Sequence, residues 1–202
     1  MLRKTHLAAG VAATLIATQP NTLSELLLAV GGGSIGALIS DIDSGTSASH
    51  KDADRITLAT IGILAGTAAL DYFFHTNIIS RIIASSGYAR LTGGILLFLA
   101  ICAFGKEQPH RSFMHSFLAL FLLDLAAGIV WKNIIPYFTV GFLSHLALDL
   151  FNKKRVKLLY PFKRGIAFDL CRSDGIVNKS AFLVGSFLIA IELWSFVLRL
   201  LR

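Results

Sequence analysis

Long apolar runs alternate with short polar stretches along most of the chain. The runs cover residues 7–18, 23–39, 56–74, 91–104, 113–131, 134–151 and 181–201. Because about 20 apolar residues cross the hydrocarbon core of a bilayer as a helix, runs of this length are typical of membrane segments. The pattern therefore predicts an all-α fold, a polytopic transmembrane helix bundle of about seven segments.

The first two runs differ from the others. Both are short for a membrane span, and the second reads LLLAVGGGSIGALIS, with three consecutive glycines at 31–33. Such glycines permit either a close approach between helices or a break, so these two segments are expected to be short or re-entrant. We expect the start of the chain to be retained, because no small-residue cleavage site follows the first run. With no linker or repeat, residues 1–202 are expected to form a single integral membrane domain.

Composition supports the membrane class. The chain is 54% hydrophobic and 15% charged, with a mean hydropathy of +0.68. The two cysteines, Cys102 and Cys171, fit neither a disulfide framework nor a zinc motif. The net charge of +7 is expected to set membrane orientation, and no nucleic-acid partner is expected.

If the segments alternate in direction, the polar stretches do not divide evenly between the two membrane faces. The start of the chain, the stretches SDIDSGTSASHKDADR and GKEQPHR, and the end of the sixth run all fall on one face. That face also takes fourteen of the nineteen Lys and Arg residues, and the other keeps Arg81, Arg90, Lys132, Arg199 and Arg202. By the positive-inside rule, the first face is predicted to be cytoplasmic.

The sixth run carries two polar residues inside an apolar sequence, SHLALDLF. His145 and Asp149 are four residues apart, so in a helix both side chains point to one face. An Asp at the centre of a membrane helix costs about 2.5 to 3.5 kcal/mol. Their presence therefore indicates a function or a partner that offsets this cost.

Four short motifs on the predicted cytoplasmic face supply imidazoles and carboxylates: KTHLAAG, SDID, PHRSFMHS and SHLALD. This mixture suits Zn²⁺, Mn²⁺ or Fe, with zinc favoured, and is sufficient for one to three divalent ions. The candidate metal ligands are His6, Asp41, Asp43, His110, His115, His145 and Asp149.

Each motif also has an ordinary interpretation. A D-x-D after a helix is usually a turn with a cap, and His145 with Asp149 could be a metal-free pair. His110 and His115 are five apart, about 140° around a helix, so they share a site only if His110 precedes the helix, which Pro109 favours. Joint placement on one face favours the metal site, and His50 is a possible auxiliary ligand.

The order of these motifs, from the N-terminal His through DID and HRSFMHS to GFLSHLALDL and a basic YPF segment, resembles the YdjM-type family of bacterial inner-membrane proteins. That resemblance extends to about Asn178 and implies a metal-dependent hydrolase in the bacterial inner membrane. Members typically show Pro where this chain has Ser40, the pattern HRG-x-T-HS where it has Ser112 and Met114, and often a late Glu where it has Asn178.

The His and Asp pattern is also distantly similar to the zinc-dependent phospholipase C and single-strand nuclease group, which implies phosphoester chemistry. We therefore predict hydrolysis of a phosphoester in a membrane lipid or lipid-linked phosphate by a metal-activated water. Arg111, expected to neutralise developing negative charge, and Asp43 are the candidate catalytic residues. A metal or proton-coupled transporter and a non-catalytic scaffold remain as alternatives, and the sequence does not predict the oligomeric state.

Overall fold

The computed structural model describes residues 2–45, 48–171 and 175–201, without the side chains of 48–54 and 57. Within these residues the fold is all-α, as predicted, and its eight α-helices are α1 (Arg3–Thr18), α2 (Leu23–Ile39), α3 (Ala48–Phe74), α4 (Ile78–Ala84), α5 (Ser86–Lys106), α6 (Phe117–Val130), α7 (Ile135–Leu150) and α8 (Ile176–Leu200). Three short 3-10 helices, η1 (Ser40–Asp43), η2 (Phe113–His115) and η3 (Lys132–Ile134), extend or join them.

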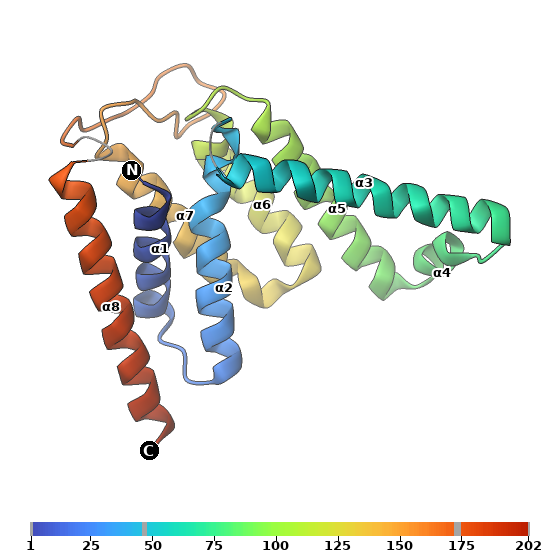
Figure 1. The fold of residues 1–202 in the computed structure, drawn as a ribbon, viewed down its shortest axis with the longest axis horizontal. Coiled ribbons are helices and arrows are strands. Elements are labelled where there is room, and N and C mark those ends of the chain that lie inside the picture. Colours follow the sequence, from blue (N-terminus) through green and yellow to red (C-terminus); the bar gives the residue numbers. More distant parts are fainter. Residues whose placement is uncertain (1, 46–47, 172–174, 202) are drawn as a thin grey trace.

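Four helices form the bundle that carries the site. Helix α2 packs along α7 and α1, and α1 also packs against α7 and α8. Helices α3, α4 and α5 extend away from this bundle as an arm, and α6 packs against α5 (Figure 1). The N-terminus, the end of α2 and the loop that joins α7 to α8 lie at one end of the bundle, and the C-terminus lies at the other (Figure 1).

The number of helices able to cross a membrane is smaller than the predicted seven segments. Within the described chain, three helical stretches are long and apolar enough, Leu23–Asp43, Ser86–Lys106 and Ile176–Leu200, and a fourth is counted if the bent pair Leu58–Phe74 and Ile78–Ala84 forms one span. That pair bends by 113°. Helices α1, α6 and α7 have only 14 to 16 residues, or roughly 21 to 24 Å, against a hydrocarbon core of about 30 Å.

The glycine run of α2 produces a close helix approach and no break. Helix α2 continues through Gly33, and with η1 it forms one of the candidate spans. A Cβ added to Gly36 would lie 2.2 Å from the carbonyl oxygen of Phe138 in α7, and one added to Gly141 would lie 2.3 Å from the carbonyl oxygen of Gly33. The two backbones are therefore in contact, as small residues allow in membrane bundles.

Helix α6 begins four residues later than the apolar pattern predicts. Ser116 adopts an extended conformation, and its hydroxyl accepts a hydrogen bond from the backbone N–H of Ala119, so Ser116 is the N-cap. Phe113–His115 forms the separate helix η2 before it. His115 and His110 therefore both precede α6, and His110 lies in the turn that follows Pro109, as its candidate ligand role required.

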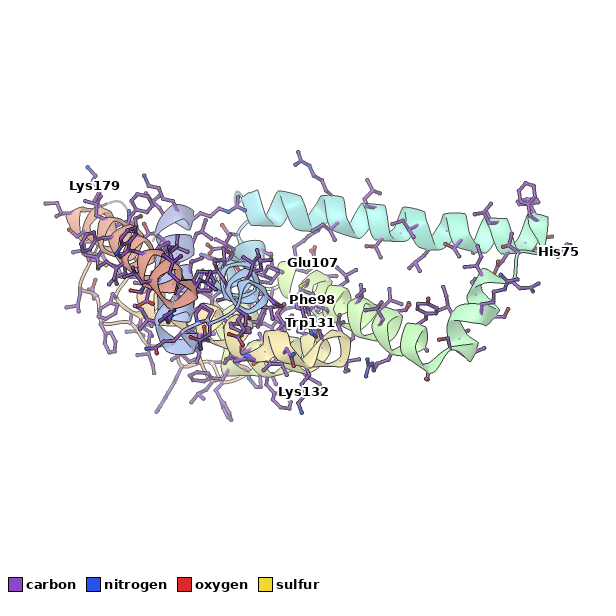
Figure 2. The ribbon with its side chains drawn as sticks, turned by 90° about the horizontal axis from the view of Figure 1, so that it is seen from below. His75, Phe98, Glu107, Trp131, Lys132 and Lys179 are labelled. Carbon is purple, nitrogen blue, oxygen red and sulfur yellow. The ribbon has the colours of Figure 1, made fainter. Side chains whose placement is uncertain are left out.

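Apolar side chains lie largely on the outside of the molecule and polar ones inside the bundle. Leu58, Phe73 and Phe187 are about 70% exposed, whereas His115 and His145 are fully buried. Figure 2 shows the side chains of α3 projecting outward along the arm, with His75 at its far tip and Lys179 at the opposite end of the molecule. This inverted distribution is the one expected for helices whose outer surface meets lipid.

Replacing Gly36 with Ala is expected to destabilise the protein by about 1–3 kcal/mol, because the new methyl group would overlap backbone atoms of Phe138 and Phe142 that cannot rotate away. Gly31→Ala is the matched control, since nothing lies within 4 Å of its Cβ position in the same helix. Thermal unfolding of the two variants in detergent measures the difference. Equal melting temperatures would contradict the close packing of α2 and α7.

Candidate metal centre

All seven predicted ligands converge at one end of the bundle. The first helix brings His6, η1 brings Asp41 and Asp43, the turn before η2 and η2 itself bring His110 and His115, and α7 brings His145 and Asp149. These side chains form three adjoining groups, each with donor atoms within 4.8 Å of one another: His6, His145 and Asp149; Asp41, His115 and His145; Asp43, His110 and His115. Because His145 and His115 belong to two groups each, the three groups form one continuous cluster.

The middle of this cluster holds two imidazole nitrogens that face each other. The Nε2 atoms of His115 and His145 are 3.3 Å apart, and both side chains are completely buried. Two carboxylate oxygens complete the arrangement. Asp149 Oδ2 lies 3.4 Å from His115 Nε2 and 4.0 Å from His145 Nε2, and Asp41 Oδ1 lies 4.0 and 3.8 Å from the same two atoms.

These separations fit a shared metal ion. With metal–ligand bonds of about 2.0–2.2 Å, tetrahedral geometry places neighbouring ligand atoms roughly 3.3–3.6 Å apart. The measured separations of 3.3 to 4.0 Å are equal to that value or slightly longer. The donor set of two imidazoles and two carboxylates is also one that zinc and related divalent ions bind. The central candidate donors are therefore His115, His145 and Asp41, with Asp149 Oδ2 within 4.0 Å of both imidazoles.

Each of the two central histidines has a contact at Nδ1, the ring nitrogen that points away from the centre of the cluster. His145 Nδ1 lies 2.6 Å from the carbonyl oxygen of Ala37, an acceptor only, so Nδ1 carries the proton and the neutral ring directs the lone pair of Nε2 into the cluster. His115 Nδ1 lies 3.2 Å from Asp43 Oδ2. A histidine that contacts a carbonyl or carboxylate through its other ring nitrogen is the usual arrangement in metal sites.

Asp149 connects two parts of the cluster. Its Oδ1 lies 3.5 Å from His6 Nε2, whereas its Oδ2 faces the central histidines. The ring of His6 stacks on that of His145 with 3.9 Å between centroids, and within the described chain no hydrogen-bond partner faces the buried Nδ1 of His6. A carboxylate with one oxygen on each side is suited to bridging two ions.

Arg111 holds the cluster together from its outer side. Its guanidinium lies 3.0 Å from Asp149 Oδ2 and donates to the carbonyl oxygen of Lys154. Its backbone N–H donates to Asp43 Oδ2 at 3.0 Å, in a left-handed conformation with φ of 66°. A non-glycine residue in this region is strained by about 1–2 kcal/mol, which these contacts offset. The predicted stabilisation of a phosphoryl charge by Arg111 stays a prediction.

One edge of the cluster is open to solvent. The side chain of His110 is 36% exposed, and its Nδ1 lies 2.7 Å from Asp43 Oδ1. Asp41 is partly exposed, whereas Asp43 is buried between His110 and His115. Access from this edge is therefore through His110 and Asp41, while His6, His145 and Asp149 form the closed inner end.

Negative charge dominates the cluster. Burial alone would lower the pKa of His115, but hydrogen bonding to Asp149 and Asp43 and the charges of both carboxylates raise this pKa to about 9. A histidine that binds its proton so firmly indicates a surplus of carboxylate charge around it. A divalent cation would balance carboxylate charge here, where Asp43 and Asp149 are buried and the guanidinium of Arg111 pairs with Asp149.

The contacts of some residues around the cluster could not be predicted from the sequence. The side-chain oxygen of Asn178 in α8 accepts a hydrogen bond from the N–H of Leu2 at 3.0 Å, and its carbonyl accepts the hydroxyl of Thr5 at 3.4 Å. Asn178 therefore fixes the start of α1, next to His6. The carbonyl of Ala37 was likewise not predictable. The side chain of His50, the possible auxiliary ligand, lies outside the described residues.

The chain was compared with known proteins. The model of the family described as YdjM inner membrane protein matches residues 1–200, which is almost the whole chain. Comparisons with curated proteins and with solved structures found no match.

We expect the purified protein to bind at least one divalent transition metal, and Asp149→Asn or His115→Ala to remove most of it, because each change deletes a central donor. Elemental analysis of detergent-purified protein measures the metal content. Asp169→Asn is the control, since this exposed carboxylate pairs with Lys153 outside the cluster. Metal content that is equal in wild type and both cluster variants would exclude the site.

Proposed function

We propose that this chain, which belongs to the YdjM family of inner membrane proteins, is a membrane-bound metal-dependent hydrolase that cleaves a phosphoester of a lipid-like substrate. One observation carries the proposal: the Nε2 atoms of His115 and His145 lie 3.3 Å apart, and an oxygen of Asp41 and one of Asp149 each lie 3.4 to 4.0 Å from both of them.

The central donors would hold the first ion, with zinc favoured by the mixture of imidazole and carboxylate. His6 with Asp149, and His110 with Asp43, are the flanking groups that could hold a second and a third. When bound, such an ion supplies Lewis acidity and a hydroxide nucleophile at neutral pH, because it lowers the pKa of its bound water to about 7.

His110 at the open edge and two buried residues behind it, Asp43 and Arg111, have the remaining roles in this proposal. His110 and Asp43 form a hydrogen-bonded imidazole and carboxylate pair at the solvent side, so His110 can pass a proton to the leaving oxygen while Asp43 orients its ring. Arg111 keeps Asp149 in place through its guanidinium and adds positive charge beside the phosphoryl group.

The location of the cluster favours hydrolysis over transport. Its residues come from the first turns of α1, from η1 at the end of α2, from the segment before α6 and from the last two turns of α7. Transporter sites lie near the bilayer midplane, between broken helices. A site at helix ends is instead at the level of lipid headgroups, so we propose a membrane lipid or a lipid-linked phosphate as the substrate.

The activity is tested with phosphatidate and phosphatidylglycerol, a phosphomonoester and a phosphodiester, presented to zinc-loaded protein in mixed micelles. We expect release of phosphate or of the glycerol headgroup from at least one of them. His145→Ala should lower the rate by at least the roughly 10- to 100-fold that loss of an outer metal partner costs, since it removes a ligand. Asp169→Asn should retain wild-type activity.

Thermal stability is measured on the same variants, so that unfolding is not mistaken for loss of chemistry. If His145→Ala is folded and metal-poor but hydrolyses the substrate as fast as wild type, the cluster is not the catalytic site. If metal-loaded wild type hydrolyses neither lipid, the proposed substrate class is wrong.

The orientation of the site is tested by cysteine labelling in a background without Cys102 and Cys171. Because α8 is long and apolar enough to cross the membrane, Leu201 at its end and Lys163 in the loop before it should lie on opposite faces. The excess of Lys and Arg on the loop side predicts that Lys163→Cys reacts with an impermeant thiol reagent only in opened cells, and Leu201→Cys in intact cells. The reverse labelling pattern would place the site at the outer face of the membrane.

A further inference from the structure

The loop between α7 and α8 contains a basic hollow that the proposed chemistry does not use. This hollow has a volume of about 1300 Å³, and four of its lining residues are cations: Arg155, Lys157, Lys163 and Arg164. Among the described residues, none that line it is acidic, and none of these four side chains makes an ion pair. Four like charges around one open space repel one another, so the hollow is suited to an anion.

The loop is held in a defined shape. Val156 and Ile166 form an antiparallel bridge, with hydrogen bonds of 2.8 and 2.9 Å between their backbone groups, and the side chain of Val156 is fully buried. Next to this bridge, the N–H of Lys157 donates to the carbonyl of Arg111 and the carbonyl of Leu158 accepts from Phe117. The hollow is therefore fixed to the backbone that also carries the metal cluster.

Apolar side chains stand beside the cations. Leu159 and Phe162 line the hollow and are 61% and 70% exposed, and Ile166 is about half exposed. Exposed leucine and phenylalanine next to lysine and arginine form the pattern of a surface that enters the boundary between headgroups and acyl chains. The loop lies at the end of the bundle where α8, a candidate span, begins (Figure 1).

We propose that the basic hollow of residues 155–167 binds the phosphate of an anionic membrane phospholipid, with Leu159 and Phe162 against its acyl chains. Arginine and lysine are the side chains that recognise phosphate, and near an anionic membrane surface each of them strengthens the attraction to the lipid headgroups. The apolar rim distinguishes a lipid from a soluble phosphate, which would leave Leu159 and Phe162 in water. This binding needs no metal and no hydrolysis, so it goes beyond the proposed function.

The test is native mass spectrometry of detergent-purified protein titrated with dioleoyl phosphatidylglycerol or with zwitterionic dioleoyl phosphatidylcholine. Wild type is expected to bind the anionic lipid about tenfold more tightly or better, and K163Q/R164Q to lose about tenfold in that affinity. K153Q/K154Q is the matched control: it removes the same charge from the same loop, outside the hollow, and should stay within about twofold of wild type. Phe162→Ser should weaken lipid binding without any change in charge.

Several results would overturn the proposal. One is wild-type affinity in K163Q/R164Q, and another is an equal loss in K153Q/K154Q, which would indicate only a general charge effect. Displacement of the lipid by glycerol 3-phosphate at equal concentration would identify the ligand as a soluble phosphate. Asp149→Asn should bind the lipid as wild type does, so lipid binding can be judged even if the proposed hydrolase activity is not found. Melting temperatures confirm that each variant is folded.

Discussion

The close approach of α2 and α7 determines where the candidate site can form. The two backbones touch at Gly36 and Gly141, where any side chain would overlap a carbonyl of the other helix. One residue beyond Gly36, the carbonyl of Ala37 reaches His145 Nδ1 at 2.6 Å. A helix pair separated by ordinary side chains, with axes 8–10 Å apart, would leave this carbonyl out of reach and the ring of His145 free to turn. The packing of small residues therefore also fixes the orientation of His145, a candidate metal ligand.

Electrostatics explains why the polar residues gather at helix ends. Three carboxylates within the apolar interior would each be costly, and here they share histidines, a guanidinium and the backbone N–H of Arg111. Such a network needs irregular backbone, which η1, η2 and the left-handed Arg111 supply. The short helices α1 and α7 fit this requirement, because each places its polar turn at the cluster and its apolar turns within the bundle.

The sequence identified the candidate site better than it identified the membrane topology. His145 and Asp149 were predictable as a pair because a spacing of four residues fixes their common face in any helix. The convergence of His6, η1 and the segment before α6 was predictable from the alternation of polar stretches alone. The count of spans was not, because apolar runs such as that of α7 also occur in helices buried by their neighbours: Phe138 and Phe142 are covered by protein. Hydropathy does not distinguish contact with lipid from contact with another helix.

Other features depend on contacts that no local pattern encodes. The role of Asn178 arises from a hydrogen bond across 176 residues of sequence, and that of the Ala37 carbonyl from backbone packing. Arg111 was recognised as a candidate for its charge, but its attachment to Asp149 and to the loop at Lys154 follows only from the fold.

The bridging position of Asp149 has a consequence for biosynthesis. His6 is among the first residues to leave the ribosome, and Asp149 follows about 140 residues later, after six helices have been made. Until then Asp41 lacks its contact with His145 of α7, whereas the partners of Asp43, His110 and His115, precede that helix in the chain. When α7 arrives, its imidazole and carboxylate join the first helix to the seventh. The cluster can therefore be complete only after the seventh helix has been made.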